Sequence, residues 1–284
     1  MRIAGEVEPL ISGFPTPEGP AFDRDGILCF VDWEASAIIA LTPEGVAGEL
    51  FNTKGIPAGL AFHPDGSLWV ADEGENIHGL LRIGRDGESA IVVNEYQGQP
   101  LNGANDLVFD SEGVVYFSDP WRSSADNPIG AFYRYFPDGR LEQIDSGLAF
   151  PNGVALSADG SYVYLAETYR NRILRYPING DGTVGPREKF ADTDEPPGPD
   201  GMAFDVNGDL YVAHWDGGRV DVFDQKGRQV DEIRVPGIKP TNVAFGGSDN
   251  KDLIITEVET GSLYRVRMNV AGQPLHDGRS HFGG

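Results

Sequence analysis

The sequence contains few of the residues that mark several common classes of protein. It has a single cysteine, Cys29, so no internal disulfide can form and a buried, unreactive thiol is the expected role. Lys and Arg together number 22 against 44 Asp and Glu, which gives a net charge of −22. This acidity repels phosphate backbones and no basic run offsets it, so we expect no nucleic-acid partner.

Long apolar runs are also missing. No segment reaches the length of a membrane span, and residues 1–8 lack the apolar core of a secretion signal. We therefore expect a soluble, cytoplasmic protein with no membrane partner. No stretch keeps a 3.6-residue apolar period, so no long helix is expected. Hydrophobic residues make up 40% of the chain, which is enough for a core and excludes a disordered chain.

A pattern that recurs six times organises the chain. Each copy has a short apolar run, a turn and a second apolar run. Equivalent positions in the six copies are Phe22, Phe62, Phe109, Leu156, Phe204 and Phe245. The steps between them are 40, 47, 47, 48 and 41 residues. A strand-rich repeat of this length is typical of a propeller and favours one closed domain over two separate ones.

Two series of glycine-containing turns divide each repeat into strands. In the second repeat, residues 63–66 separate expected strands at 60–62 and 67–71, and residues 85–87 separate strands at 77–83 and 89–93. Four antiparallel strands in each of six repeats predict an all-β, six-bladed β-propeller. We expect a single domain over residues 1–284, with a C-terminal tail from about 269 to 284. The strand-like run 6–12 is expected to complete the last blade and close the ring by pairing the chain's two ends, with the tail from Gly272, otherwise a surface segment, as the alternative.

One register position is polar in most repeats. In a propeller, the residue before the innermost strand opens on the same mouth of the channel as the loop after the second strand. The residues at this position are Glu18, Ala58, Asn105, Asn152, Asp200 and Thr241. Two carboxylates and two carboxamides converging on the axis suit a hard divalent cation such as Ca²⁺, Mg²⁺ or Mn²⁺. Each residue taken alone fits a turn cap, yet their recurrence at one register favours a metal or substrate site.

Sequence motifs around these positions resemble those of the SMP-30/gluconolactonase/regucalcin family. The motifs are Pro17-Glu18-Gly19-Pro20, Asn105-Asp106, Pro151-Asn152-Gly153-Val154-Ala155, Pro199-Asp200-Gly201-Met202-Ala203 and Ala213 to Val220. The resemblance extends from about Glu6 to Arg267 and implies a metal-dependent six-bladed propeller that hydrolyses sugar lactones. It implies that Glu18, Asn152 and Asp200 bind one divalent ion (Ca, Zn, Mg, Mn or Fe). It also implies that Asn105 is a substrate-side residue or a further ligand, and that Asp200 is the catalytic acid/base.

One position departs from part of that family. The animal members carry an Arg two residues before the position of Asn105, where it contacts substrate, whereas this chain has Gly103. The run 102–106 is more similar to the bacterial and fungal gluconolactonase branch. The identity of the lactone is therefore open.

The loops after the second strands are expected to shape the pocket. Trp121 and Tyr169 suit stacking on a sugar ring, and Arg122 and Arg170 suit hydroxyls or a carboxylate. His214 ends a second strand and is a candidate hydrogen-bonding partner for substrate, with a structural histidine as the alternative. In the other five repeats this strand ends in an acid. Most of these acids are expected to accept backbone N–H groups between blades, with the alternative that some hold the ligand side chains in place. These acids are Asp32, Asp72, Asp119, Glu167 and Glu257.

The sequence thus predicts a metal-dependent lactonase whose partner is a small-molecule sugar lactone. Two alternatives remain. One is a calcium-dependent aryl-ester or phosphotriester hydrolase, similar to related six-bladed propellers, in which Asn105 joins the other three ligands; a hydrophobic pocket wall would favour it. The other is a non-catalytic binding propeller. The sequence leaves the native metal and the oligomeric state open.

Overall fold

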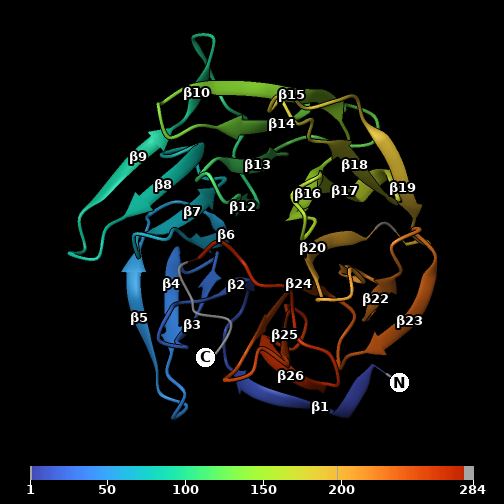
Figure 1. Cartoon of the computed structure of the whole chain (residues 1–284). Coiled ribbons are helices and arrows are strands. Elements are labelled where there is room, and N and C mark those ends of the chain that lie inside the picture. Colours follow the sequence, from blue (N-terminus) through green and yellow to red (C-terminus); the bar gives the residue numbers. More distant parts are fainter. Residues whose placement is uncertain (1, 197, 278–284) are drawn as a thin grey trace.

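Six four-stranded antiparallel sheets form a closed ring in the computed structural model, which describes residues 2–196 and 198–277 (Figure 1). This confirms the predicted all-β, six-bladed propeller. Blades 1 to 3 are built from β2 (Pro17–Phe22), β3 (Leu28–Asp32), β4 (Ala37–Leu41), β5 (Ala47–Asn52); β6 (Pro57–Phe62), β7 (Leu68–Asp72), β8 (Gly79–Ile83), β9 (Ser89–Val93); β12 (Leu107–Phe109), β13 (Val115–Asp119), β14 (Gly130–Tyr135) and β15 (Leu141–Leu148).

The second half of the ring repeats the same order, with the innermost strand of each blade first. Blades 4 to 6 are built from β16 (Pro151–Leu156), β17 (Tyr162–Glu167), β18 (Arg172–Pro177), β19 (Glu188–Asp192); β20 (Pro199–Phe204), β21 (Leu210–His214), β22 (Arg219–Phe223), β23 (Gln229–Arg234); β24 (Pro240–Gly246), β25 (Asp252–Glu257), β26 (Ser262–Met268) and β1 (Ile3–Ser12). A hairpin of β10 (Glu95–Tyr96) and β11 (Gln99–Pro100) and a short 3-10 turn, η1 (Thr168–Arg170), complete the described elements. No described helix is long and apolar enough to cross a membrane.

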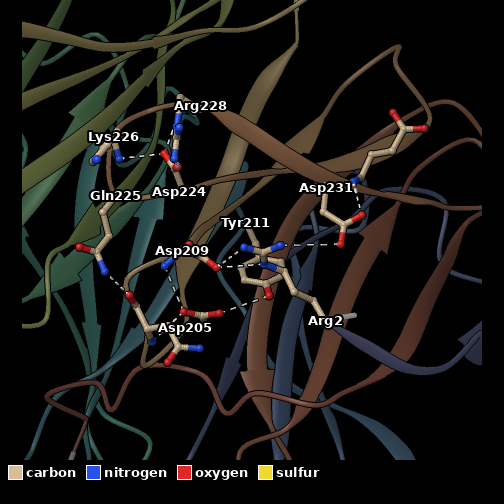
Figure 2. A network of polar contacts seen from close by, with 11 residues as sticks. Arg2, Asp205, Asp209, Tyr211, Asp224, Gln225, Lys226, Arg228 and Asp231 are labelled. Atoms are coloured by element: carbon tan, nitrogen blue, oxygen red, sulfur yellow. Dashed lines mark hydrogen bonds and ion pairs between the residues drawn. The ribbon is translucent and has the colours of Figure 1, made fainter.

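The N-terminal strand closes the ring, as one of the two predicted routes requires. β1 pairs antiparallel with β26 and supplies the outermost strand of blade 6. Just before it, Arg2 donates hydrogen bonds of 2.9 and 2.7 Å to Oδ2 of Asp209, in the β20–β21 turn of blade 5 (Figure 2). The backbone N–H of Asp209 in turn donates to Oδ1 of Asp205. The start of the chain is thereby tied to two blades.

The core lies between neighbouring blades. Apolar side chains from the facing sheets of blades 5 and 6 pack together, and the rings of Tyr211 and Phe245 meet edge to face at 5.2 Å. Blades 6 and 1 share another cluster that contains Ile254 and Phe30. Cys29 is buried as predicted, and burial raises the pKa of its thiol to about 12. Because every blade packs on two neighbours, the inner strands are held at fixed positions around the axis.

The C-terminal tail covers the mouth of the channel on the side of the glycine turns (Figure 1). The backbone N–H of Gln273 donates to the carbonyl of Phe204 at 2.9 Å, and its side-chain amide donates to the carbonyl of Leu156 at 3.0 Å. Gly272 donates to the carbonyl of Asn250 at 2.8 Å. The expectation of a surface segment is wrong for Gly272, Gln273 and Asp277, which are buried. The amide groups of Gln273 thus satisfy carbonyls at the ends of the inner strands β16 and β20. Residues 278–284 of the predicted tail lie outside the described residues.

Candidate active site

All six residues of the predicted polar column line one cavity of about 610 Å³ at the open mouth of the channel. Glu18, Asn152 and Asp200 are buried at its floor, and Asn105 is half-buried beside them. Ala58 and Thr241 complete the circle. The six residues at this register position therefore converge on one cavity, as predicted.

A backbone irregularity aims these side chains. In five blades the innermost strand begins with a proline, one residue before the column position. Proline has no N–H to donate, and the innermost strand is a sheet edge, where this loss is tolerated. The ladder then shifts register, between Glu18 and Ala21 in β2 and between Pro199 and Met202 in β20. The predicted strands start slightly later because the sequence pattern does not reveal this bulge.

The residue after the column position allows neighbouring blades to approach closely. A Cβ on Gly153 would lie 2.2 Å from the carbonyl oxygen of Asp200, and a Cβ on Gly19 would lie 2.1 Å from that of Ala58. The N–H of Gly59 donates to the carbonyl of Asn105 at 2.6 Å. Glycine is therefore required here by contact between backbones. This packing draws the six inner strands tightly around the axis.

Glu18 has one carboxylate oxygen satisfied and one free. The side-chain amide of Asn242 donates to Oε1 at 2.8 Å, across the junction of blades 6 and 1. Oε2 is buried and has no hydrogen-bond partner within the described residues. Burial raises the pKa of Glu18, because its charged form has lost water without full compensation. A cation at this oxygen would supply the missing interaction.

The carboxyl groups beneath the cavity act on one another. Burial raises the pKa of Asp200 well above its usual value, and the nearby charges of Glu18, Asp106 and Glu73 raise it further. Asp106 follows Asn105 in the chain, and burial raises its pKa to about 7 although its Oδ2 accepts a 2.7 Å hydrogen bond from the N–H of Val154. These groups favour either bound protons or a bound cation.

Glu73 also belongs to the site, although the register of the repeats did not single it out. It follows β7, is buried, and lines the cavity. The side-chain amide of Asn105 donates to its Oε1 at 2.8 Å. This bond commits the NH₂ group of Asn105 and leaves its carbonyl oxygen for another partner. The available signal was the Asp72-Glu73 pair at the end of a second strand, but no other repeat has a second acid there.

The donor set fits a hard cation. The described residues contain no cluster of three or more His, Cys, Asp or Glu side chains in a metal-binding arrangement. Any ion would therefore also draw on carboxamide oxygens, and Asn152 at the cavity floor offers one. Carboxylate and carboxamide oxygens suit Ca²⁺, Mg²⁺ or Mn²⁺ better than Zn²⁺, which prefers nitrogen and sulfur. The unpaired Oε2 of Glu18 is the observation in the structure that agrees with this assignment.

Aromatic side chains form the wall above the carboxyl groups. Trp121 and Tyr169 line the cavity, as expected, together with Trp33, Phe150 and Trp215. The rings of Phe150 and Tyr169 lie 5.3 Å apart. The two expected arginines are absent from the lining. Arg122 forms a 2.7 Å ion pair with the exposed Glu75, and Arg170 donates to the carbonyl of Ala125 at 3.0 Å.

His214 lies outside the cavity lining. Its ring is fully buried, with Nδ1 at 2.6 Å from Oδ2 of Asp221 and Nε2 at 2.9 Å from the carbonyl oxygen of Pro196. Both ring nitrogens are therefore engaged within the protein. This arrangement matches the structural alternative, in which the imidazole ties the loop before β20 to β22, and does not match direct contact with substrate.

The acids at the ends of the second strands hold the linkers between blades, as predicted. Oδ1 of Asp72 accepts from the N–H groups of Ile56 and Gly74 at 2.9 and 2.8 Å. Asp119 accepts from the N–H groups of Asn102 and Gly103 at 3.0 and 2.7 Å. Glu167 and Glu257 make equivalent bonds to the N–H groups of residues 149 and 239. These bonds position the loops that carry Asn105 and Glu73.

We expect the metal-free protein to lose stability as the pH rises from about 5 to about 8. Burial raises the pKa of Glu73 to about 8, and an unfolded Glu titrates near 4.3. Because the pKa of Glu73 is higher in the folded protein, its neutral carboxyl group favours the folded state. This contribution to stability is fully present below the unfolded pKa and is lost as the pH rises through the folded pKa. Each such group contributes a slope of up to about 1.4 kcal/mol per pH unit.

The measurement is the melting temperature in a chelator across this pH range, for the wild type and for Glu73→Gln. The amide cannot ionise, so the variant should melt with a shallower pH dependence. An unchanged slope would mean that Glu73 does not titrate as its burial requires. Glu18→Gln provides a second variant with the same expected sign, because burial also raises the pKa of Glu18.

The fold and the site together define a class of protein: a six-bladed propeller with an oxygen-rich cavity on its axis and an aromatic rim. Residues 16–259 match the SMP-30/Gluconolactonase/LRE-like region, and the chain belongs to this family. This confirms the resemblance carried by the motifs at Glu18, Asn152 and Asp200.

Individual relatives support the same placement. The chain is 31% identical to pentonolactonase XacC of Haloferax volcanii, over 90% of this chain and 92% of that protein. It is 29% identical to diisopropyl-fluorophosphatase of Loligo vulgaris, over 98% of both chains. Among solved structures, a gluconolactonase from Xanthomonas campestris is 25% identical, covers 94% of this chain and 91% of its own, and superimposes with a TM-score of 0.83.

Proposed function

We propose that this protein is a divalent-metal-dependent hydrolase that opens a sugar lactone to its aldonic acid. The observation that carries the proposal is the convergence of Glu18, Asn152 and Asp200 on one buried cavity floor, with Oε2 of Glu18 unpaired. The lactonase names of two relatives, the Haloferax pentonolactonase and the Xanthomonas gluconolactonase, support the reaction class.

In this proposal Glu18, Asn152 and Asp200 hold the ion. When bound, the ion polarises the lactone carbonyl and stabilises negative charge on its oxygen. Asn105 orients the substrate through the carbonyl oxygen that its bond to Glu73 leaves free. Trp121 and Tyr169 stack on the ring and exclude water from the reacting face.

Asp200 serves as the acid/base. In the metal-free protein, burial and neighbouring charges raise the pKa of Asp200; a bound cation would oppose this shift, keeping the carboxylate ionised and able to accept a proton. As water adds to the carbonyl carbon, Asp200 accepts a proton. The bond between that carbon and the ring oxygen then breaks, the ring oxygen receives a proton, and the product is the open hydroxy acid.

A specific observation favours a second candidate, the aryl-ester or phosphotriester hydrolase. The cavity wall is largely aromatic, and the two arginines that would bind hydroxyls or a carboxylate are engaged elsewhere. The relationship to diisopropyl-fluorophosphatase agrees with this candidate. In it, Asn105 joins Glu18, Asn152 and Asp200 around Ca²⁺.

The test is proton release from a panel of aldonolactones and aryl esters, using metal-stripped protein with single divalent ions added back. We expect turnover of an aldonolactone only when an ion is present. Turnover of aryl esters alone would favour the second candidate. Equal rates in chelator and in metal would remove the ion from the proposal.

A further inference from the structure

The cavity contains acidic groups and no basic ones. Among the described residues, its lining includes Glu18, Glu34, Glu73 and Asp200, and no Lys, Arg or His. One divalent ion balances the charge of two carboxylates and leaves no excess positive charge. The net charge of the whole chain is −22, so the long-range electrostatic field of the protein also repels anions.

Basic side chains near the rim are already engaged. Arg122 pairs with Glu75, and Arg170 bonds to a backbone carbonyl. The ammonium group of Lys239 lies 5.1 Å from the ring centroid of Trp215, a cation–π contact. None of the three lines the cavity.

The backbone also excludes a basic side chain at Gly103, two residues before Asn105 of the cavity lining. Gly103 has a φ of +142°, and a Cβ there would lie 2.9 Å from Cα of Glu73 and 2.9 Å from Cβ of Trp121. The positive φ and the contact with Cα of Glu73 are backbone features, which no change of side-chain rotamer relieves. The loop that brings Glu73 to Asn105 therefore occupies the space that a basic side chain would need.

The wall offers apolar surface where a charged substituent would need a partner. Three of the chain's four tryptophans, Trp33, Trp121 and Trp215, line the cavity. Flat aromatic faces pack against C–H groups of a ring and cannot compensate a desolvated carboxylate or phosphate. We propose that this cavity accepts uncharged ring substrates and rejects those that carry a carboxylate or phosphate. The predicted difference in turnover rests on the proposed lactonase function. The predicted difference in binding between neutral and anionic rings does not.

The test compares ligands that differ in one group. D-glucono-1,4-lactone ends in CH₂OH at C6, and D-glucaro-1,4-lactone ends in a carboxylate there. Binding is measured separately with the 1,5-lactams of gluconic and glucaric acid, which are not turned over, by quenching of the cavity tryptophans in metal-loaded protein. We expect the neutral lactam to bind, and the neutral lactone to react, at least roughly tenfold better than the anionic one at low salt.

The outcomes separate the two proposals. Selective binding of the neutral lactam without turnover of any lactone supports the charge preference and contradicts the lactonase. Equal binding, a preference for the anion, or binding of neither lactam overturns the charge preference. As a matched pair, Ile56→Lys places a cation in the half-buried wall, and Ile56→Met alters the same position without charge. Only the lysine variant should reduce the ratio of neutral-lactam affinity to anionic-lactam affinity. An equal change of this ratio in both variants overturns the proposal.

Discussion

Asp200→Asn is expected to reduce lactone turnover by about 10³-fold or more while the protein remains folded. Asp200 is asked to supply two functions at once, a charged oxygen for the ion and a proton acceptor for the reaction. The amide keeps the shape of the side chain but removes both. Because burial and neighbouring charges already oppose ionisation of Asp200 in the metal-free protein, the amide should not destabilise that state.

The measurement is kcat/KM for the best neutral lactone, together with the affinity for the activating ion. Asp200→Ala should lose activity to a similar extent. Asp205→Asn is a matched control in the same blade, since Asp205 is buried in the turn at the opposite end of β20, where it accepts from the N–H groups of Asn207 and Asp209. It should lower stability and leave kcat/KM of the folded protein near the wild-type value. An Asp200→Asn enzyme with more than a tenth of wild-type activity would exclude Asp200 as the acid/base.

The polar column was predictable because a propeller converts sequence register into position. Once the repeats were aligned, Glu18, Asn152 and Asp200 had to occupy equivalent places near one axis. Glycine turns marked strand ends for the same reason. Strand number and the floor of the cavity follow from a periodic pattern, which the sequence displays directly, whereas the last strand of blade 6 lies outside the repeat and had two candidates.

Features that break the repeat could not be found in this way. Glu73 reaches Asn105 through a loop of one blade only, and His214 is turned from the cavity by Asp221 and a backbone carbonyl. Arg122 and Arg170 are diverted by partners on neighbouring loops. These orientations depend on contacts with other segments of the chain, 7 residues away for His214 and Asp221 and 47 residues away for Arg122 and Glu75. Residue type and register alone do not encode them.

The buried carboxyl groups of the site lower the stability of the protein, and the close packing of the inner strands holds them in place. The carboxyl groups of Glu18, Glu73, Asp106 and Asp200 are all buried, and the pKa of each is raised. Such a cluster opposes folding when ionised, so the ring must hold it in place by other contacts. The inner strands do so through close backbone packing, which makes the glycine positions sensitive to substitution.

Gly153→Ala is expected to lower the free energy of unfolding by about 2–4 kcal/mol and to impair ion binding. The new Cβ would meet the carbonyl oxygen of Asp200 at 2.2 Å and Cα of Gly201 at 2.8 Å. Both are backbone atoms, so blades 4 and 5 must separate. Gly153 follows Asn152 directly, so the separation would move two proposed ligands apart.

The measurement pairs thermal unfolding with ion affinity below the melting temperature. In a chain of this length, a loss of this size lowers the melting temperature by roughly 3–7 °C. Gly48→Ala in β5 is the matched control, because a Cβ there meets nothing within 4 Å and the backbone conformation suits alanine. It should change stability by less than about 0.5 kcal/mol and leave ion affinity intact. If Gly153→Ala melted like the wild type, the inner strands would not be in the close contact that positions the site; if it were destabilised but bound the ion normally, Asn152 and Asp200 would not both be ligands.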